Sequence, residues 1–215
     1  MTIFFKLIAA AALAAAALVA ATQAQAKALV VYFSANGPAM SADARPSGRM
    51  GSTQFVAYVI KDELGADIYR LETAKPYEAG DLAQLRAIAR HEHKDNARPE
   101  MKSPLPDLSK YDTIYIGNPV WWHDYPMVFY TMFDRYDFAG KNLVAFDTSY
   151  GSGASAMVEL LKKAEPGARV FPECLAVSGD TARDSADAIR TWLRERHLSV
   201  RTVAFQPVPQ RATLP

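Results

Sequence analysis

The clearest structural signal in this chain is the run Thr113-Ile114-Tyr115-Ile116-Gly117, which leads into Asn118-Pro119-Val120-Trp121-Trp122-His123-Asp124-Tyr125-Pro126. An unbroken β-branched and aromatic run that ends at Gly and Asn-Pro is typical of a strand buried on both faces of a parallel sheet. Open α/β sheets bind ligands at the carboxyl ends of their strands. Two adjacent tryptophans at that place indicate a flat ligand stacked on indole.

Short apolar runs alternate with amphipathic runs along the rest of the chain. The pattern predicts strands at 28–33, 67–71, 112–117, 142–146 and 170–177, and helices at 55–64, 82–93, 127–133, 155–164 and 182–196. Five strands that alternate with helices favour a three-layer α/β domain around a parallel sheet. The segment from Val200 to Phe205 is open to two interpretations, a loose extension or a small extra strand.

The first 26 residues have the features of a secretory signal peptide. Lys6 precedes an apolar run from Leu7 to Ala21, and Ala24-Gln25-Ala26 gives the small-x-small ending of a cleavage site. The run is shorter than the ~20 residues that span a bilayer, so an uncleaved anchor is the weaker alternative. We therefore expect a signal peptide at 1–26, one domain at 27–198 and a C-terminal extension at 199–215. The protein would be periplasmic or otherwise exported, without stable membrane insertion after cleavage.

Charge and cysteine content narrow the classes of partner. The chain has 24 Lys and Arg side chains against 23 Asp and Glu side chains, which gives no electrostatic case for nucleic acid or an anionic membrane surface. Cys174 is the single cysteine, so no disulfide can form within the chain. His91 and His93 stand on a polar helix at i, i+2 and therefore point in different directions, which argues against a metal site.

Two further loops follow predicted strands and carry small polar residues. Ser34 begins the loop after the first strand, and after an interval of about 16 residues Gly51-Ser52-Thr53-Gln54 opens a helix whose N–H groups and hydroxyls suit a phosphate. The segment from Thr148 to Gly153 follows the fourth strand and contains two glycines. Taken alone, the first also fits an ordinary helix cap and the second a flexible turn.

The combination of these loops resembles the flavodoxin-like FMN-binding family, in the group with a Trp-Trp second loop and a Gly-Ser-Gly third loop. The chain is similar to an exported, long-loop member, and the likeness runs from about Ala28 to Leu193. The resemblance implies a three-layer flavodoxin-like sandwich whose five-stranded parallel sheet has the order 2-1-3-4-5. It implies FMN as the cofactor, bound at the switch point of the sheet.

The resemblance also assigns residues to parts of FMN. The 5′-phosphate would be held by Ser34, Ser52, Thr53 and Gln54. The isoalloxazine would be bordered by Asn118, Pro119, Val120, Trp121, Trp122 and His123, and its pyrimidine edge closed by Thr148, Ser149, Tyr150, Gly151, Ser152 and Gly153. Within the second loop, Trp122 would shield one face of the ring, and Trp121 would anchor the loop in the core.

Two positions depart from the family pattern. His123 stands where the family has a glycine beside the flavin N5. We expect it to make a positive φ costly and to hinder the peptide flip that stabilises one-electron-reduced flavin. His123 is also a candidate proton donor, because the ordinary histidine pKa of ~6.5 suits proton transfer near neutrality. Tyr150 replaces another glycine, and it would either stack on the ring opposite Trp122 or fill the pocket.

These observations favour an exported FMN-binding protein that carries out electron transfer, with a redox partner protein or a small-molecule electron acceptor. An FMN-dependent quinone or nitro-compound reductase is an alternative within the enzymes. A flavin-free binding module on the same fold is the alternative from another class, if His123 and Tyr150 have reshaped the pocket.

Overall fold

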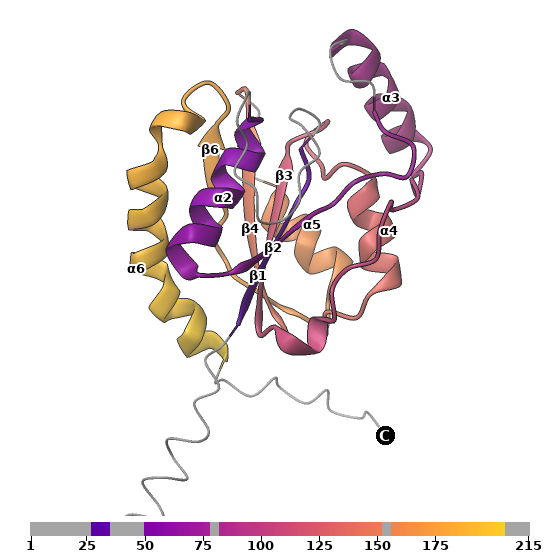
Figure 1. Ribbon diagram of the computed structural model, residues 1–215. Helices are drawn as coiled ribbons and strands as arrows, with labels where there is room; N and C mark the ends of the chain where they lie inside the picture. Colours follow the sequence, from indigo (N-terminus) through magenta and orange to yellow (C-terminus); the bar gives the residue numbers. More distant parts are fainter. Residues whose placement is uncertain (1–26, 35–49, 78–81, 152–155, 205–215) are drawn as a thin grey trace, which may run out of the picture.

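A parallel β-sheet covered by helices on both faces makes up the described part of the chain, residues 27–34, 50–77, 82–151 and 156–204 of the computed structural model (Figure 1). The strand order is β2-β1-β3-β4-β5, with β6 also paired to β4. The strands are β1 (Ala28–Tyr32), β2 (Asp67–Arg70), β3 (Thr113–Pro119), β4 (Asn142–Ser149), β5 (Arg169–Val170) and β6 (Leu175–Ser178). The expected order 2-1-3-4-5 is confirmed.

The fifth predicted strand, 170–177, is broken into β5 and β6. β5 pairs with the beginning of β4 at Asn142 and Leu143, whereas β6 pairs with the end of β4 from Phe146 to Ser149. Pro172 lies in the gap, where it has no N–H to donate to a ladder. The two segments therefore form one interrupted edge strand, which is why the sheet has six strands instead of five.

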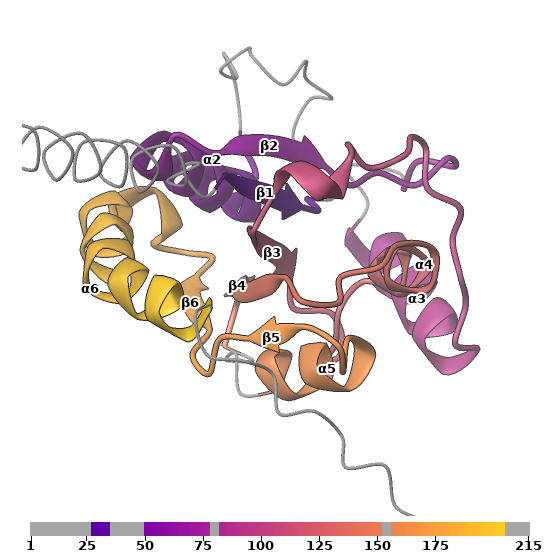
Figure 2. The same ribbon diagram turned by 90° about the horizontal axis from the view of Figure 1, so that it is seen from below.

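In the described part of the chain, four helices cover the two faces of the sheet, and a fifth lies beyond the carboxyl ends of its strands. One face packs against α2 (Ser52–Leu64) and α6 (Ala186–Ala204), and the other against α4 (Val128–Arg135) and α5 (Met157–Ala164). Figure 2 shows the sheet between these two layers. The remaining helix, α3 (Leu82–Lys94), projects beyond the carboxyl ends of the strands on the α4 side (Figures 1 and 2).

Alternate residues of the central strands enter two separate cores. Val31 and Ile116 pack on the α4 and α5 side, and Val30, Tyr115 and Val144 pack on the α2 and α6 side. All of them are at most 2% exposed. Burial on both faces explains why these strands read as unbroken apolar runs instead of alternating patterns.

The C-terminal segment corrects one interpretation of the sequence. The stretch from Val200 to Ala204 continues α6 and forms no strand, and Phe205 lies outside the described residues. No Gly or Pro separates Val200 from the preceding helix, and adding a residue to an existing helix is easier than starting a strand. The helix also crosses the expected domain limit at 198.

The expected signal peptide at 1–26, most of the long interval after Ser34 and the end of the extension, 205–215, lie outside the described residues. In the ranges that are described, no helix has the length and apolar character needed to cross a membrane.

Candidate functional site

A cavity of about 520 Å³ opens at the carboxyl ends of β1, β3 and β4. Eleven of the expected site residues line it: Ser34, Ser52, Thr53, Pro119, Val120, Trp121, Trp122, His123, Thr148, Ser149 and Tyr150. The structure therefore brings together residues from all three predicted loops. Open parallel sheets bind ligands at this end of their strands.

The N-terminus of α2 faces this cavity without a side-chain cap. Gly51 is the N-cap residue and has no side chain to accept a hydrogen bond from the first turn, which also contains no acidic residue. The first bond of the helix runs from the Phe55 N–H to the Gly51 carbonyl at 3.0 Å, so the N–H groups of residues 52–54 precede the ladder. Three backbone donors and the positive end of the helix dipole suit a phosphate.

The hydroxyls beside this helix end already have partners. Ser52 Oγ donates to the Gly179 carbonyl at 3.0 Å, and Thr53 Oγ1 lies 2.7 Å from Thr148 Oγ1. The Gln54 side chain is fully buried and does not line the cavity. The backbone of residues 52–54 is thus the main donor set for an anion.

The two tryptophans of the second loop have different environments. Trp121 packs edge-to-face against Phe33 and Tyr77, with ring centroids 5.3 and 5.4 Å apart, which agrees with the anchoring role expected for it. Trp122 is 42% exposed, and the guanidinium of Arg90 lies 4.4 Å from the centroid of its ring. Trp122 therefore offers indole surface to a ligand, whereas Trp121 fixes the loop.

The backbone at Trp122 and His123 forms a tight two-residue turn. The N–H groups of Trp121 and Asp124 each donate to the other residue's carbonyl, at 3.0 and 2.9 Å. Both central residues have positive φ, 53° at Trp122 and 63° at His123, which defines a type I′ turn. Each non-glycine residue in this region costs roughly 1–2 kcal/mol, and such strain is typical of functional loops. His123 thus adopts the positive φ that was expected to be costly there, and Trp122 also has a positive φ.

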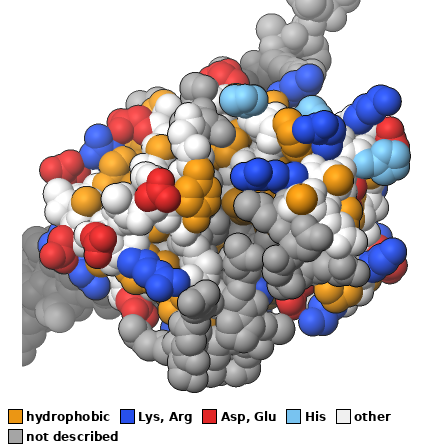
Figure 3. Space-filling model, turned by 90° about the horizontal axis from the view of Figure 1, so that it is seen from above, with side chains coloured by type: hydrophobic (Ala, Val, Ile, Leu, Met, Phe, Trp, Pro, Cys, Tyr) orange, Lys and Arg blue, Asp and Glu red, His pale blue; other side chains and the backbone are white. Residues whose placement is uncertain are grey.

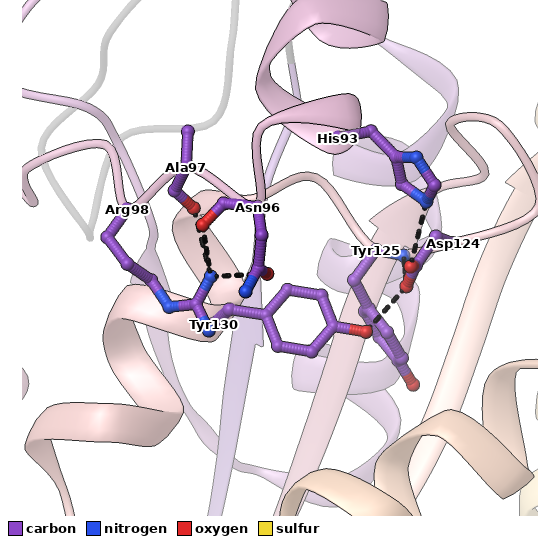
Figure 4. Close-up of polar contacts among 7 residues, drawn as sticks. All are labelled: His93, Asn96, Ala97, Arg98, Asp124, Tyr125 and Tyr130. Atoms are coloured by element: carbon purple, nitrogen blue, oxygen red, sulfur yellow. Dashed lines mark hydrogen bonds and ion pairs between the residues drawn. The ribbon is translucent and has the colours of Figure 1, made fainter.

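Asp124 holds this turn in place through side-chain contacts (Figure 4). Its Oδ1 accepts a hydrogen bond from the Tyr130 hydroxyl at 2.7 Å and from the Tyr125 N–H at 2.6 Å. Its Oδ2 lies 3.2 Å from His93 Nε2 on α3. One carboxylate thus connects the tryptophan loop with both α4 and α3. His93, which stands on a polar helix in the sequence, has this carboxylate as a partner.

Tyr150 does not fill the cavity. Its side chain is 74% exposed and its ring lies against Gly179, where an added Cβ would come within 2.6 Å of the ring. Tyr150 was expected either to stack on the flavin ring or to fill the pocket, and in the structure it does not fill the pocket. The ring stands at the rim, on the opposite side of β4 from the β3 loop that carries Trp122.

Three expected site residues lie near the cavity without lining it. Asn118 is fully buried, and its Nδ2 donates to the Pro119 carbonyl at 3.1 Å. Gly151 has a φ of 98°, which favours glycine, and Gln54 is a buried residue in the first turn of α2. Ser152 and Gly153 fall outside the described residues.

One wall of the cavity was missed by sequence reasoning. It comes from α3, which contributes Leu85, Arg86, Ala89 and Arg90. Their i, i+4 spacing identifies one face of a helix, but nothing local in the sequence shows that this face turns toward the strand ends. Within the described part of the chain, no cluster of His, Cys, Asp and Glu has the makings of a metal site.

The donor set of the cavity fits FMN. The backbone N–H groups at the start of α2, which have no side-chain cap from Gly51, suit the phosphate, and the exposed ring of Trp122 suits the isoalloxazine. Both features border the same cavity.

Comparisons with known proteins agree with this geometry. A family model described as Flavodoxin matches residues 27–196. A solved structure from Bacteroides eggerthii, assigned as a flavoprotein, is 30% identical over 80% of this chain and 98% of that chain, with a TM-score of 0.64. A second, from Bacteroides uniformis, is 29% identical over 79% and 98% of the two chains, with a TM-score of 0.62.

A flavoprotein from Lactobacillus acidophilus, solved in complex with FMN, is 23% identical over 75% of this chain and 99% of that chain, with a TM-score of 0.55. At this level of identity it shows a shared fold. A comparison with curated proteins finds no match.

Proposed function

Because the chain belongs to the flavodoxin family, we propose that it is an exported protein that binds FMN without a covalent bond and transfers electrons. Family membership and the donor set of the cavity support FMN as the cofactor. The observation that carries the proposal is a single cavity bordered by the uncapped N-terminus of α2 and by the exposed ring of Trp122. These two features match the two chemically different ends of FMN.

Each part of the chain has a defined role in this proposal. The backbone of residues 52–54 binds the phosphate, and Trp122 covers one face of the isoalloxazine. The side chain of Trp121 and the contacts of Asp124 fix the loop that carries Trp122. FMN supplies the redox chemistry when it is bound, and the protein orients its ring and controls the access of water to it.

The reductase alternative has one observation in its favour. His123 is exposed and lines the cavity, where its ring can hold or release a proton close to a bound substrate. The alternative of a flavin-free binding module is less well supported, because Tyr150 lies at the rim and does not fill the cavity. The electron-transfer proposal therefore stays first, with a redox partner protein or a small-molecule acceptor.

Export is the part of the proposal that rests on the sequence of residues 1–26. We expect the secreted protein to begin at Lys27, after the Ala24-Gln25-Ala26 ending. N-terminal sequencing of the exported form checks this, and a mature chain that retains Met1 would contradict it.

Replacing Trp122 by Ala should weaken FMN binding by roughly 1–3 kcal/mol, because the substitution removes an aromatic stacking surface. Fluorescence titration of apoprotein with FMN measures the effect. Trp192→Ala is the matched control, since Trp192 lies on α6, packs against Phe171 outside the cavity lining, and should leave FMN affinity unchanged when replaced. Equal FMN affinity in wild type and Trp122→Ala would exclude the stacking role. A purified protein that binds no FMN would overturn the proposed function.

A further inference from the structure

We propose that Arg86 and Arg90 of α3 form a second, anion-binding site in the mouth of the cavity, which takes the carboxylate of a small, flat, aromatic electron acceptor. The inference rests on the proposed FMN function and names the class of molecule that meets the flavin. The site is distinct from the phosphate site at the start of α2.

The two arginines lie apart from the phosphate donors. They stand one helical turn apart on α3, so their side chains share one face, and both line the cavity. The α2 helix packs on one face of the sheet, and α3 lies toward the other (Figure 2). The α2 backbone is placed to bind the phosphate of FMN, so the phosphate does not need either guanidinium group.

Neither arginine has a carboxylate partner among the described residues. Two arginines of α6, by contrast, are paired with carboxylates, Arg194 with Glu63 at 2.8 Å and Arg196 with Glu173 at 2.7 Å. Two like charges at i, i+4 destabilise a helix slightly when nothing neutralises them. An anion bound between Arg86 and Arg90 would remove that repulsion.

The stacking of Arg90 on Trp122 prepares it for a carboxylate. The guanidinium lies 4.4 Å from the ring centroid, and its N–H groups lie in its own plane. A guanidinium over an aromatic ring can still donate through N–H groups that point away from the ring, so a bidentate bond to a carboxylate stays open to Arg90. Trp122 thus holds the guanidinium beside the site at which the flavin ring is proposed to stack.

Among the described residues that line the cavity, the fully charged side chains have one sign, because they are Arg86 and Arg90. None of the described residues that line it is Asp or Glu. Glu92, the acidic residue of α3, is bonded to Tyr77 at 2.7 Å outside the cavity lining, and Asp124 is occupied by Tyr130 and His93. Blue and pale blue side chains gather over the α3 side of this face in Figure 3. An anionic molecule is therefore attracted to this mouth.

The aromatic character of the acceptor follows from the same surface. Among the described residues, Trp122 at 42% and Tyr150 at 74% are the large hydrophobic side chains with high exposure, and both border the cavity. A flat ring with one carboxylate matches exposed aromatic surface next to two unpaired guanidinium groups.

The test compares 4-nitrobenzoate with 4-nitrobenzamide, which share a ring and differ in charge, on the full chain loaded with FMN. Calorimetric titration should show that the wild type binds the benzoate about tenfold more tightly than the benzamide, as expected for a charged hydrogen-bonded pair. The ratio should fall to near one in the double variant Arg86→Gln, Arg90→Gln. Lys94→Gln removes the same charge from α3 outside the cavity lining and should keep the wild-type ratio.

The FMN affinity of each variant is measured alongside. A wild type that takes FMN but binds the two probes equally overturns this inference alone, as does an unchanged ratio in the double variant. A wild type that takes no FMN overturns the proposed function, and this inference with it.

Discussion

Replacing Gly117 by Ala should destabilise the protein by about 3 kcal/mol, because there is no space for a methyl group beneath the site. Gly117 lies in β3 directly opposite Phe146 of β4, and a Cβ at this position would come within 1.9 Å of Phe146 Cζ. Phe146 is fully buried, so a movement of its ring would disturb packed neighbours in the core. Urea or thermal unfolding measures the loss, which corresponds to a fall in Tm of roughly 6–12 °C.

A second substitution separates this steric conflict from a general weakening of the strand. Phe146→Leu alone removes buried ring surface and should cost stability. When it is combined with Gly117→Ala, it also removes the clashing atoms, so the double variant should lose less than the sum of the two single losses. Additive losses would show that Phe146 is not the obstacle.

The fold was predictable because the central strands are buried on both faces. Runs such as Val30-Val31 and Ile114-Tyr115-Ile116 have no polar interruption, and an apolar run between turn residues has few other interpretations. The break between β5 and β6 was harder to anticipate. It lies in an edge strand around Pro172, where pairing to one neighbour alone tolerates a gap that a central strand does not.

The candidate site was predictable where it follows strand ends, and not where it depends on tertiary packing. Trp121 and Trp122 follow β3 and Thr148 lies near the end of β4, so the parallel order of the sheet brings them to one edge. Arg86 and Arg90 reach the same cavity from a helix between two strands. Their position depends on contacts between distant segments, including that of His93 with Asp124, which no local pattern encodes.

The turn at Trp122 and His123 adds a second residue to the expected obstacle to a peptide flip. Sequence reasoning places the obstacle to a peptide flip on His123. Reversing the central peptide of a type I′ turn gives a type II′ turn, in which only the first central residue keeps a positive φ, and glycine dominates that position. That position is Trp122, so His123 would be relieved by the flip while Trp122 would oppose it.

A change of Asp147 to Asn should remove a large pH dependence of stability. Asp147 lies in β4, fully buried, and burial raises the pKa of its carboxyl from 3.8 to about 6. Among the described residues its side chain has one hydrogen-bond partner, the Cys174 thiol, whose Sγ donates to Oδ2 at 3.2 Å, whereas Oδ1 has none. The pKa of Cys174 is raised as well, by burial and by this carboxyl, so the thiol stays protonated as a donor.

The sign of the effect follows from the direction of the shift. Because the folded pKa lies above the unfolded one, the folded state binds the proton more tightly, and the resulting stability is complete below about pH 4. It is lost as pH rises through about 6, and two pKa units correspond to about 3 kcal/mol. The Asn variant carries no such proton. Its stability relative to wild type should therefore rise by about that amount between pH 4 and pH 7.5, as measured by urea unfolding at a series of pH values.

Glu165→Gln provides the matched comparison for this experiment. Burial, aided by the charges of Asp137 and Asp134, raises the pKa of Glu165 to about 7. The difference curve of this variant should have the same sign but a midpoint about one pH unit higher than that of Asp147→Asn. Contributions from all other groups cancel when each variant is compared with wild type at the same pH. Parallel stability profiles for wild type and Asp147→Asn would show that the buried carboxyl of β4 does not titrate in this range, and that the end of β4 beside Thr148 tolerates its charge.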